Sequence, residues 1–159
     1  MRSTECPLSV HPSSETRQVT SLRLSFVGLN GSIPTSIGFL TGLKELLMTE
    51  NTIHGELPAV ICQCTLLETM ELSRNRISGV LPDCLGTMDR LYKIDLRANQ
   101  ISGEIPRSLG GMQALEELML SGNQLSGAIP AELYDAKRLE VRSPHAYGVR
   151  DAACPISTG

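Results

Sequence analysis

The feature that most constrains this sequence is a 24-residue period, which recurs five times without insertion or deletion. The copies are 19–42, 43–66, 67–90, 91–114 and 115–138. One copy contains Leu67, Met70, Leu72, Asn75, Ile77, Gly79, Leu81 and Pro82 in fixed positions. A period of this length predicts a solenoid, because each copy is one supersecondary unit that stacks on the next. Residues 1–18 are then a lead-in and residues 139–159 a tail.

The apolar residues follow the period closely. Counted from the start of each copy, they recur at offsets 0, 3, 5, 10, 14, 18 and 21, and 33 of these 35 positions hold Leu, Ile, Val or Met. The alternation at offsets 3 and 5 predicts a short strand, and stacked copies would form a parallel sheet. A single copy cannot bury its own apolar side, so neighbouring copies are expected to bury it.

Three further positions are interpreted as architectural. Offset 8 holds asparagine in four copies and Val27 in the first. A carboxamide both donates and accepts hydrogen bonds, so it can satisfy backbone groups at a bend. Glycine at offset 12 suits a tight turn, and proline at offset 15 ends an extended segment.

The charge and the aromatic content of the chain make some classes of binding partner less suitable than others. A net charge of −3 argues against nucleic acid, and 3% aromatic residues without Trp leave few stacking platforms. No apolar run approaches the roughly 20 residues of a membrane span. The segment beginning at Met1 has no apolar stretch typical of a secretory signal. A cytoplasmic location is therefore expected if Met1 is the natural start.

The repeat resembles the plant-type leucine-rich repeat, L-x-x-L-x-L-x-x-N-x-L-x-G-x-I-P-x-x-L-G-x-L. The segment Ile101-Ser102-Gly103-Glu104-Ile105-Pro106 is close to that consensus. Members of the family are mostly ectodomains of plant receptor-like kinases, receptor-like proteins and polygalacturonase inhibitors. The resemblance implies an α/β-type repeat solenoid with five coils, a short parallel β-sheet on the concave face and an irregular or 3-10 convex side. It also implies an extracellular or cell-surface location.

The two ends depart from that family. Its N-terminal cap usually carries paired cysteines and a Trp, whereas the lead-in here has Cys6 alone and no Trp. Leu8 and Val10 are expected to cover the open core of the first copy. The tail is expected to form a C-terminal cap with three apolar candidates: Val141, Tyr147 and Val149.

The chain has five cysteines: Cys6, Cys62, Cys64, Cys84 and Cys154. An odd number would leave one free thiol in a secreted protein. Cys62 and Cys84 are predicted to lie side by side on adjacent coils, and similar stretches around both residues occur in plant receptor-like proteins. The sequence therefore leaves two alternatives for this pair, a disulfide or two buried inert thiols. Cys64 occupies a core position and is expected to act as a small apolar residue.

Asn30-Gly31-Ser32 is a glycosylation acceptor pattern. This site, the possible Cys62–Cys84 bridge and the family resemblance favour a location outside the cell. The missing signal and the odd number of cysteines favour a location inside it. Both locations stay open on the sequence.

Catalysis has little support in the sequence. The three histidines His11, His54 and His145 have no patterned Ser, Cys or Asp partner. No Gly-rich phosphate loop precedes a helix, and Cys62, Cys64, Cys84 and His54 do not have the spacing of a zinc motif. We therefore expect no enzymatic activity, no cofactor and no metal.

Function is instead predicted on the concave face, at positions that the repeat leaves free. Arg74, Arg76 and Arg97 are predicted to cluster at its centre, where Glu71 and Asp95 would lie one strand apart as like charges. The predicted partner-binding residues are Arg23, Phe26, Leu47, Glu50, Glu71, Arg74, Arg76, Lys93, Asp95, Arg97 and Met119. The apolar members of this set are predicted to be exposed.

We interpret the chain as a monomeric, non-catalytic module that recognises a protein or peptide through this face. A charge-reversed Arg74/Arg97 variant is expected to keep its fold and lose a partner. One alternative is a structural subunit packed into a larger assembly. Another is a secreted inhibitor of a cell-wall-degrading enzyme.

Overall fold

The computed structural model describes residues 18–134, 136, 138 and 139 of the chain. The predicted caps lie outside these residues, with Leu8 and Val10 at one end and Val141, Tyr147 and Val149 at the other. Cys6 and Cys154 lie outside them too.

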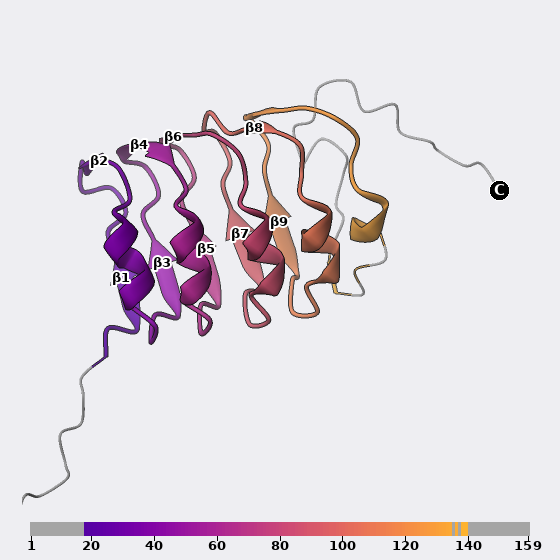
Figure 1. Cartoon of the computed structure of the whole chain (residues 1–159). Helices are drawn as coiled ribbons and strands as arrows, with labels where there is room; N and C mark the ends of the chain where they lie inside the picture. The colour runs from indigo at the N-terminus through magenta and orange to yellow at the C-terminus, as the bar shows by residue number, and fades with distance from the viewer. Residues whose placement is uncertain (1–17, 135, 137, 140–159) are drawn as a thin grey trace, which may run out of the picture.

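Short strands recur every 24 residues and pair in parallel (Figure 1). They form one five-stranded sheet in the order β1-β3-β5-β7-β9. Its strands are β1 (Ser21–Arg23), β3 (Glu45–Leu47), β5 (Thr69–Glu71), β7 (Lys93–Asp95) and β9 (Glu117–Met119). Equivalent positions of successive repeats pair with each other, so Leu22 pairs with Leu46 and Met70 with Ile94. The predicted parallel sheet is therefore confirmed.

A second set of very short strands follows the first along each coil. β2 (Asn30–Gly31), β4 (Thr52–Glu56) and β6 (Arg76–Ser78) form one parallel sheet, and β8 (Ser102–Gly103) pairs with β10 (Gln124–Leu125). The glycine at offset 12 lies at or just beyond these strands with a positive φ, 78° at both Gly79 and Gly103. Glycine adopts this conformation without the penalty that a β-carbon brings.

The opposite side of each coil is a short 3-10 helix, as predicted for the convex side. The helices are η1 (Thr35–Phe39), η2 (Ala59–Gln63), η3 (Asp83–Thr87), η4 (Arg107–Gly111) and η5 (Ala131–Leu133). A proline precedes each of them in an extended conformation, and its carbonyl accepts the first helical hydrogen bond, as from Ile37 N–H to Pro34 O at 3.0 Å. Proline suits this place because the first N–H groups of a helix have no partner within it.

The core fills the space between the sheet and the 3-10 helices. At offset 0, Leu43, Leu67, Leu91 and Leu115 are all fully buried, whereas Val19 is 44% exposed. A coil is buried only by its neighbours, and within the described residues the first coil has a neighbour on one side only. The core prediction is therefore correct for the inner coils and wrong for Val19.

The asparagines at offset 8 join successive coils. Asn75 donates from Nδ2 to the carbonyls of Met48 (2.9 Å) and Leu72 (3.0 Å), and its Oδ1 accepts from Ile53 N–H at 3.0 Å. Asn51, Asn99 and Asn123 make the equivalent bonds one repeat away. The ladder thus satisfies buried backbone groups that no strand pairs, as the sequence predicted.

Candidate functional site

The concave face is formed by the five-stranded sheet, whose side chains alternate between the core and the surface. Equivalent side chains form columns across the sheet because the strands pair in register. One column contains Arg23, Leu47, Glu71, Asp95 and Met119. Neighbours in a column are about 4.8 Å apart, so their charges interact directly.

Asp95 is the buried acid of this column. Its side chain is only 5% exposed, and Arg97 donates to it from Nε (2.9 Å), from Nη2 (2.7 Å) and from the backbone N–H (3.1 Å). Burial raises the pKa of Asp95, but the hydrogen bonds from the Arg97 side chain and backbone outweigh it and hold the pKa below its ordinary value. Asp95 occupies one of the positions that the repeat leaves free, yet its carboxylate is buried, and Arg97 binds both of its oxygens.

The predicted repulsion between Glu71 and Asp95 is relieved by two different cations. Lys93 Nζ lies 3.0 Å from Glu71 and 3.4 Å from Glu117, and Arg97 neutralises Asp95. The hydrogen bond to Glu71 is the main cause that raises the pKa of Lys93. These contacts form a chain of alternating charges across β5, β7 and β9.

A separate ion pair lies at the N-terminal end of the sheet. Arg23 Nη2 is 2.8 Å from Glu45 Oε2, and Ser21 Oγ donates to the same oxygen at 2.7 Å. The hydrogen bond from Ser21, together with that from Arg23, lowers the pKa of Glu45. Arg23 is thus held in place by a neighbouring strand.

Arg74 pairs with Glu50 on the preceding coil, with 2.8 Å between Nη1 and Oε1. Both residues have left-handed backbones, with φ of 56° and 55°. The same offset is left-handed in every coil, with φ of 61° at Phe26, 53° at Ala98 and 73° at Gly122. In the sequence the only sign of this left-handed position is the single glycine, Gly122, and it was not predicted.

The three central arginines therefore have different roles. Arg74 is bound to Glu50 and Arg97 to Asp95. Arg76 is exposed, and it has neither an ion pair nor a side-chain hydrogen bond within residues 18–134. Reversing the charge of Arg97 would place a third acid beside Asp95 and Glu71. An Arg74/Arg97 variant would therefore disturb the concave face itself, and Arg76 is the better residue to change.

The polar residues next to Arg76 extend the candidate site. Thr52, Arg76, Gln100 and Gln124 occupy the same offset in successive coils, and the two glutamines are exposed. Hydroxyl, guanidinium and carboxamide groups together supply many hydrogen-bond donors and several acceptors. This row can bind an anionic group and the polar main chain beside it.

The three apolar candidates differ in exposure. Phe26 is 71% exposed, as predicted. Leu47 and Met119 are only half-buried rather than exposed, which corrects that part of the prediction. In the concave column Leu47 lies between Arg23 and Glu71, and Met119 lies beside Asp95 on the last strand of the sheet.

Cys62 and Cys84 are joined by a disulfide, with 6.0 Å between their Cα atoms. Of the two alternatives left by the sequence, the structure contains the bridge. Cys64 is a buried free thiol whose pKa is raised by burial, which agrees with its predicted core position. Asn30 is exposed on β2, and its glycosylation stays a prediction.

In the described residues, no three His, Cys, Asp or Glu side chains are grouped to hold a metal ion. Over the same residues, no helix has the length and apolar character to cross a bilayer. An open hollow of about 570 Å³ lies off the concave columns and is lined by Glu68, Arg90, Tyr92, Ala114, Glu116 and Arg138.

The model of the family described as leucine rich repeat matches residues 65–125. A comparison with curated proteins gives no significant match.

Three solved structures illustrate the similarity. The first is the plant peptide hormone receptor RGFR1 in complex with RGF2, at 33% identity and a TM-score of 0.75 over 76% of this chain and 19% of that chain. The second is the BIR3–SERK2 complex from Arabidopsis thaliana, at 32% identity and a TM-score of 0.75 over 84% of this chain and 69% of that chain. The third is the ectodomain of the receptor kinase SOBIR1 from Arabidopsis thaliana, at 34% identity and a TM-score of 0.73 over 77% and 67%. This chain therefore spans about a fifth of the hormone receptor and about two thirds of the shorter relatives.

Proposed function

This chain belongs to the leucine-rich repeat family of plant receptor ectodomains, and we propose that it is a non-catalytic module that binds a peptide or protein through its concave face. The observation that carries the proposal is Arg76. It is the first residue of β6, the strand that follows the concave strand β5 along the coil. It is exposed, and within the described residues it has no charged partner. An unpaired guanidinium on a surface is a ready binding group for a carboxylate.

The surroundings of Arg76 favour binding with little rearrangement. Arg23, Arg74, Lys93 and Arg97 are already held by acids at 2.7–3.0 Å. Side chains that are ordered before binding lose less entropy when a partner docks. The paired charges are thus ordered before a partner binds.

The relatives support a peptide as the occupant. RGFR1 is a plant peptide hormone receptor, and its structure was solved in complex with RGF2. An extended peptide could cross several strands of the sheet and place one acidic group against Arg76. The glutamines on the next coils would then bind main-chain groups of the same peptide.

The test is a selection of phage-displayed random peptides on the immobilised chain. Peptides enriched on the wild type should contain an acidic residue, and Arg76→Glu should weaken their binding about 10–100-fold. The matched control is Arg107→Glu on the convex helix η4, which makes the same charge change at another exposed arginine. It should leave binding unchanged.

The result that contradicts the proposal is equally specific. If the enriched peptides bind the Arg76→Glu protein as well as the wild type, the concave site around Arg76 is wrong. Equal weakening by Arg107→Glu would point to a general charge effect instead. Thermal melts of both variants confirm that any loss of binding is not a loss of fold, because surface substitutions of this kind typically change stability by about 0.5 kcal/mol or less.

A further inference from the structure

Neighbouring 3-10 helices on the convex side pack through one repeating glycine. Gly38 lies against Val60, Gly86 against Ser108 and Gly110 against Glu132, in each case across one coil boundary. A β-carbon on Gly86 would lie 2.5 Å from the Ser108 carbonyl oxygen, and one on Gly38 would lie 2.9 Å from the Val60 carbonyl oxygen. Since no side chain tolerates such distances, glycine is what allows these helices to approach closely.

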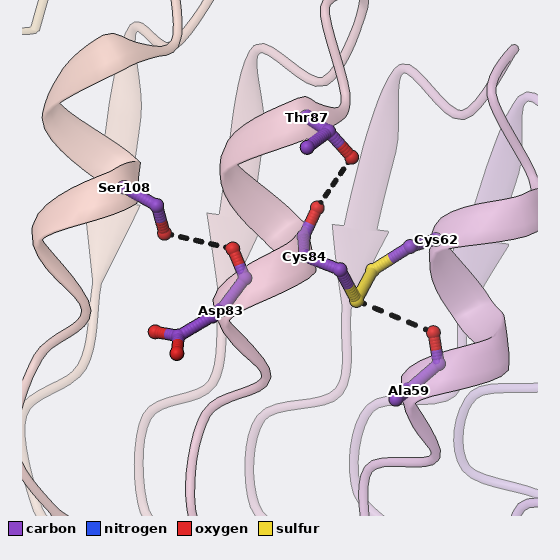
Figure 2. Close-up of a disulfide and its surroundings, with 6 residues drawn as sticks. All are labelled: Ala59, Cys62, Asp83, Cys84, Thr87 and Ser108. Atoms are coloured by element: carbon purple, nitrogen blue, oxygen red, sulfur yellow. Dashed lines mark hydrogen bonds between the residues drawn. A yellow bond between two sulfur atoms is a disulfide. The ribbon is translucent and has the colours of Figure 1, made fainter.

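Cys62 is the exception among the first four coils; the fifth coil has Tyr134 at this offset, with no further described coil to pack against. It stands 24 residues from both Gly38 and Gly86, and Cys84 stands 24 residues from both Val60 and Ser108. Cys62 therefore has a β-carbon where its equivalents have none. Correspondingly, η2 and η3 approach each other less closely than the η1–η2, η3–η4 and η4–η5 neighbours do. The disulfide spans this wider boundary (Figure 2).

The neighbouring boundary shows what the same position does without a bridge. Ser108 Oγ donates to the Asp83 carbonyl at 2.8 Å, which ties η4 to the preceding coil. Cys84 Sγ lies 3.3 Å from the Ala59 carbonyl in the equivalent arrangement (Figure 2). A disulfide sulfur has no proton to donate, whereas a reduced Cys84 thiol could donate to that carbonyl. The reduced protein would thus keep a weak contact and lose the covalent one.

We propose that the Cys62–Cys84 disulfide links the coils of η2 and η3 in place of the glycine contact that is missing there. The packing between the two parts of the solenoid is therefore sensitive to dithiols. One part carries η1 and η2, and the other carries η3, η4 and η5. The stability of a solenoid is close to a sum of repeat and neighbour terms. Loss of the link therefore weakens this boundary and leaves the glycine-packed boundaries unchanged.

The chemistry is ordinary thiol–disulfide exchange with a dithiol such as dithiothreitol. A thiolate of the reductant attacks one sulfur, the Cys62–Cys84 bond breaks and a mixed disulfide forms. The second thiol of the reductant then displaces the remaining cysteine. Two electrons and two protons pass to the two cysteines, and the reductant leaves as a cyclic disulfide. Both cysteines are half-buried at the surface, so a small dithiol can reach the bond.

Two double variants separate the bridge from the glycine contact. Cys62→Gly with Cys84→Ser recreates the pair found at Gly86 and Ser108, so it should pack closely without a disulfide. Cys62→Ser with Cys84→Ser has neither the glycine nor the bridge. We expect the first variant to unfold in one transition and to have the same stability with and without dithiothreitol. The second variant should behave like the reduced wild type.

The measurement is amide hydrogen exchange with and without dithiothreitol. In the reduced wild type, exchange should accelerate about 10–100-fold in η2 and η3, with much smaller changes in η4 and η5. Equal acceleration in all 3-10 helices would overturn the proposal, because a bridge that only restricts the unfolded chain protects every segment alike. A serine double variant that matches the oxidised wild type would overturn it too.

If the serine double variant does not fold, the redox comparison on the wild type still decides the question. The variant with Cys62→Gly and Cys84→Ser adds an independent test, since it must restore protection at η2 and η3 if the glycine contact is what the bridge replaces. Failure to do so counts against the proposal. These readouts need no ligand, so they stand or fall separately from the proposed peptide binding.

Discussion

Arg97 binds both carboxylate oxygens of Asp95, two residues before it in the same coil, at 2.9 Å and 2.7 Å. The carboxylate is buried, whereas the guanidinium is half exposed to solvent. Glu71 is the in-register neighbour of Asp95 and is held by Lys93 instead. A buried charge is stable only while its partner is present, and this pair therefore governs how the centre of the concave face responds to pH.

Asp95→Asn should destabilise the protein at neutral pH by about 1.5–3 kcal/mol, because the hydrogen bonds from Arg97 lose their charged acceptor. The pKa of Asp95 is lowered in the folded state, so its contribution is present above the pKa of the unfolded chain, about 3.9, and is lost as the pH falls through the lower folded value. The difference between wild type and variant should thus narrow below about pH 4. Urea unfolding followed by circular dichroism at several pH values measures it.

The control for this prediction is Glu104→Gln, an exposed acid with no ion pair in the described part of the chain. It should change stability by about 0.5 kcal/mol or less at any pH. A difference for Asp95→Asn that is constant from pH 7 to pH 3 would show that the carboxylate charge is not what stabilises this position.

Asn75→Ala should cost about 2–4 kcal/mol of unfolding free energy, because it leaves the buried carbonyls of Met48 and Leu72 and the N–H of Ile53 without their partner. Gln100→Ala removes a carboxamide of similar size from an exposed position and should cost about 0.5 kcal/mol or less. Chemical unfolding of both variants gives the comparison. Equal losses would mean that the asparagine ladder has no special role in joining the coils.

Ala98→Gly should stabilise the protein by about 0.5–1 kcal/mol. A left-handed conformation costs an L-residue roughly 1–2 kcal/mol, which exceeds the entropy that glycine adds to the unfolded chain. Gly122→Ala at the same offset should destabilise it, since φ is 73° there and the new β-carbon would lie 3.2 Å from Ala98 N.

Ala128→Gly is the matched control for the left-handed position, since Ala128 is exposed and is not among the residues with positive φ. It should not raise the melting temperature. If Ala98→Gly also fails to raise it, the backbone at this offset is not under the strain that the dihedral angle implies.

The period of the sequence was enough to predict the five-stranded sheet, the core of the inner coils and the asparagine ladder. These features join equivalent positions in successive copies, such as Leu22 with Leu46, so a fixed spacing along the chain determines which groups meet. Glycine, proline and asparagine then mark the turns by their own backbone chemistry.

The tertiary structure decided which concave residues are free and which are engaged. Arg74, Arg76 and Arg97 look alike in the sequence, but long side chains choose partners by geometry, and only Arg76 stays unpaired within the described residues. Burial of Asp95 and the wider boundary at Cys62 likewise depend on contacts between neighbouring coils. The sequence by itself therefore determined how the coils stack, because stacking repeats with the period. Exposure and pairing on the surface were set only in three dimensions, since they vary from coil to coil.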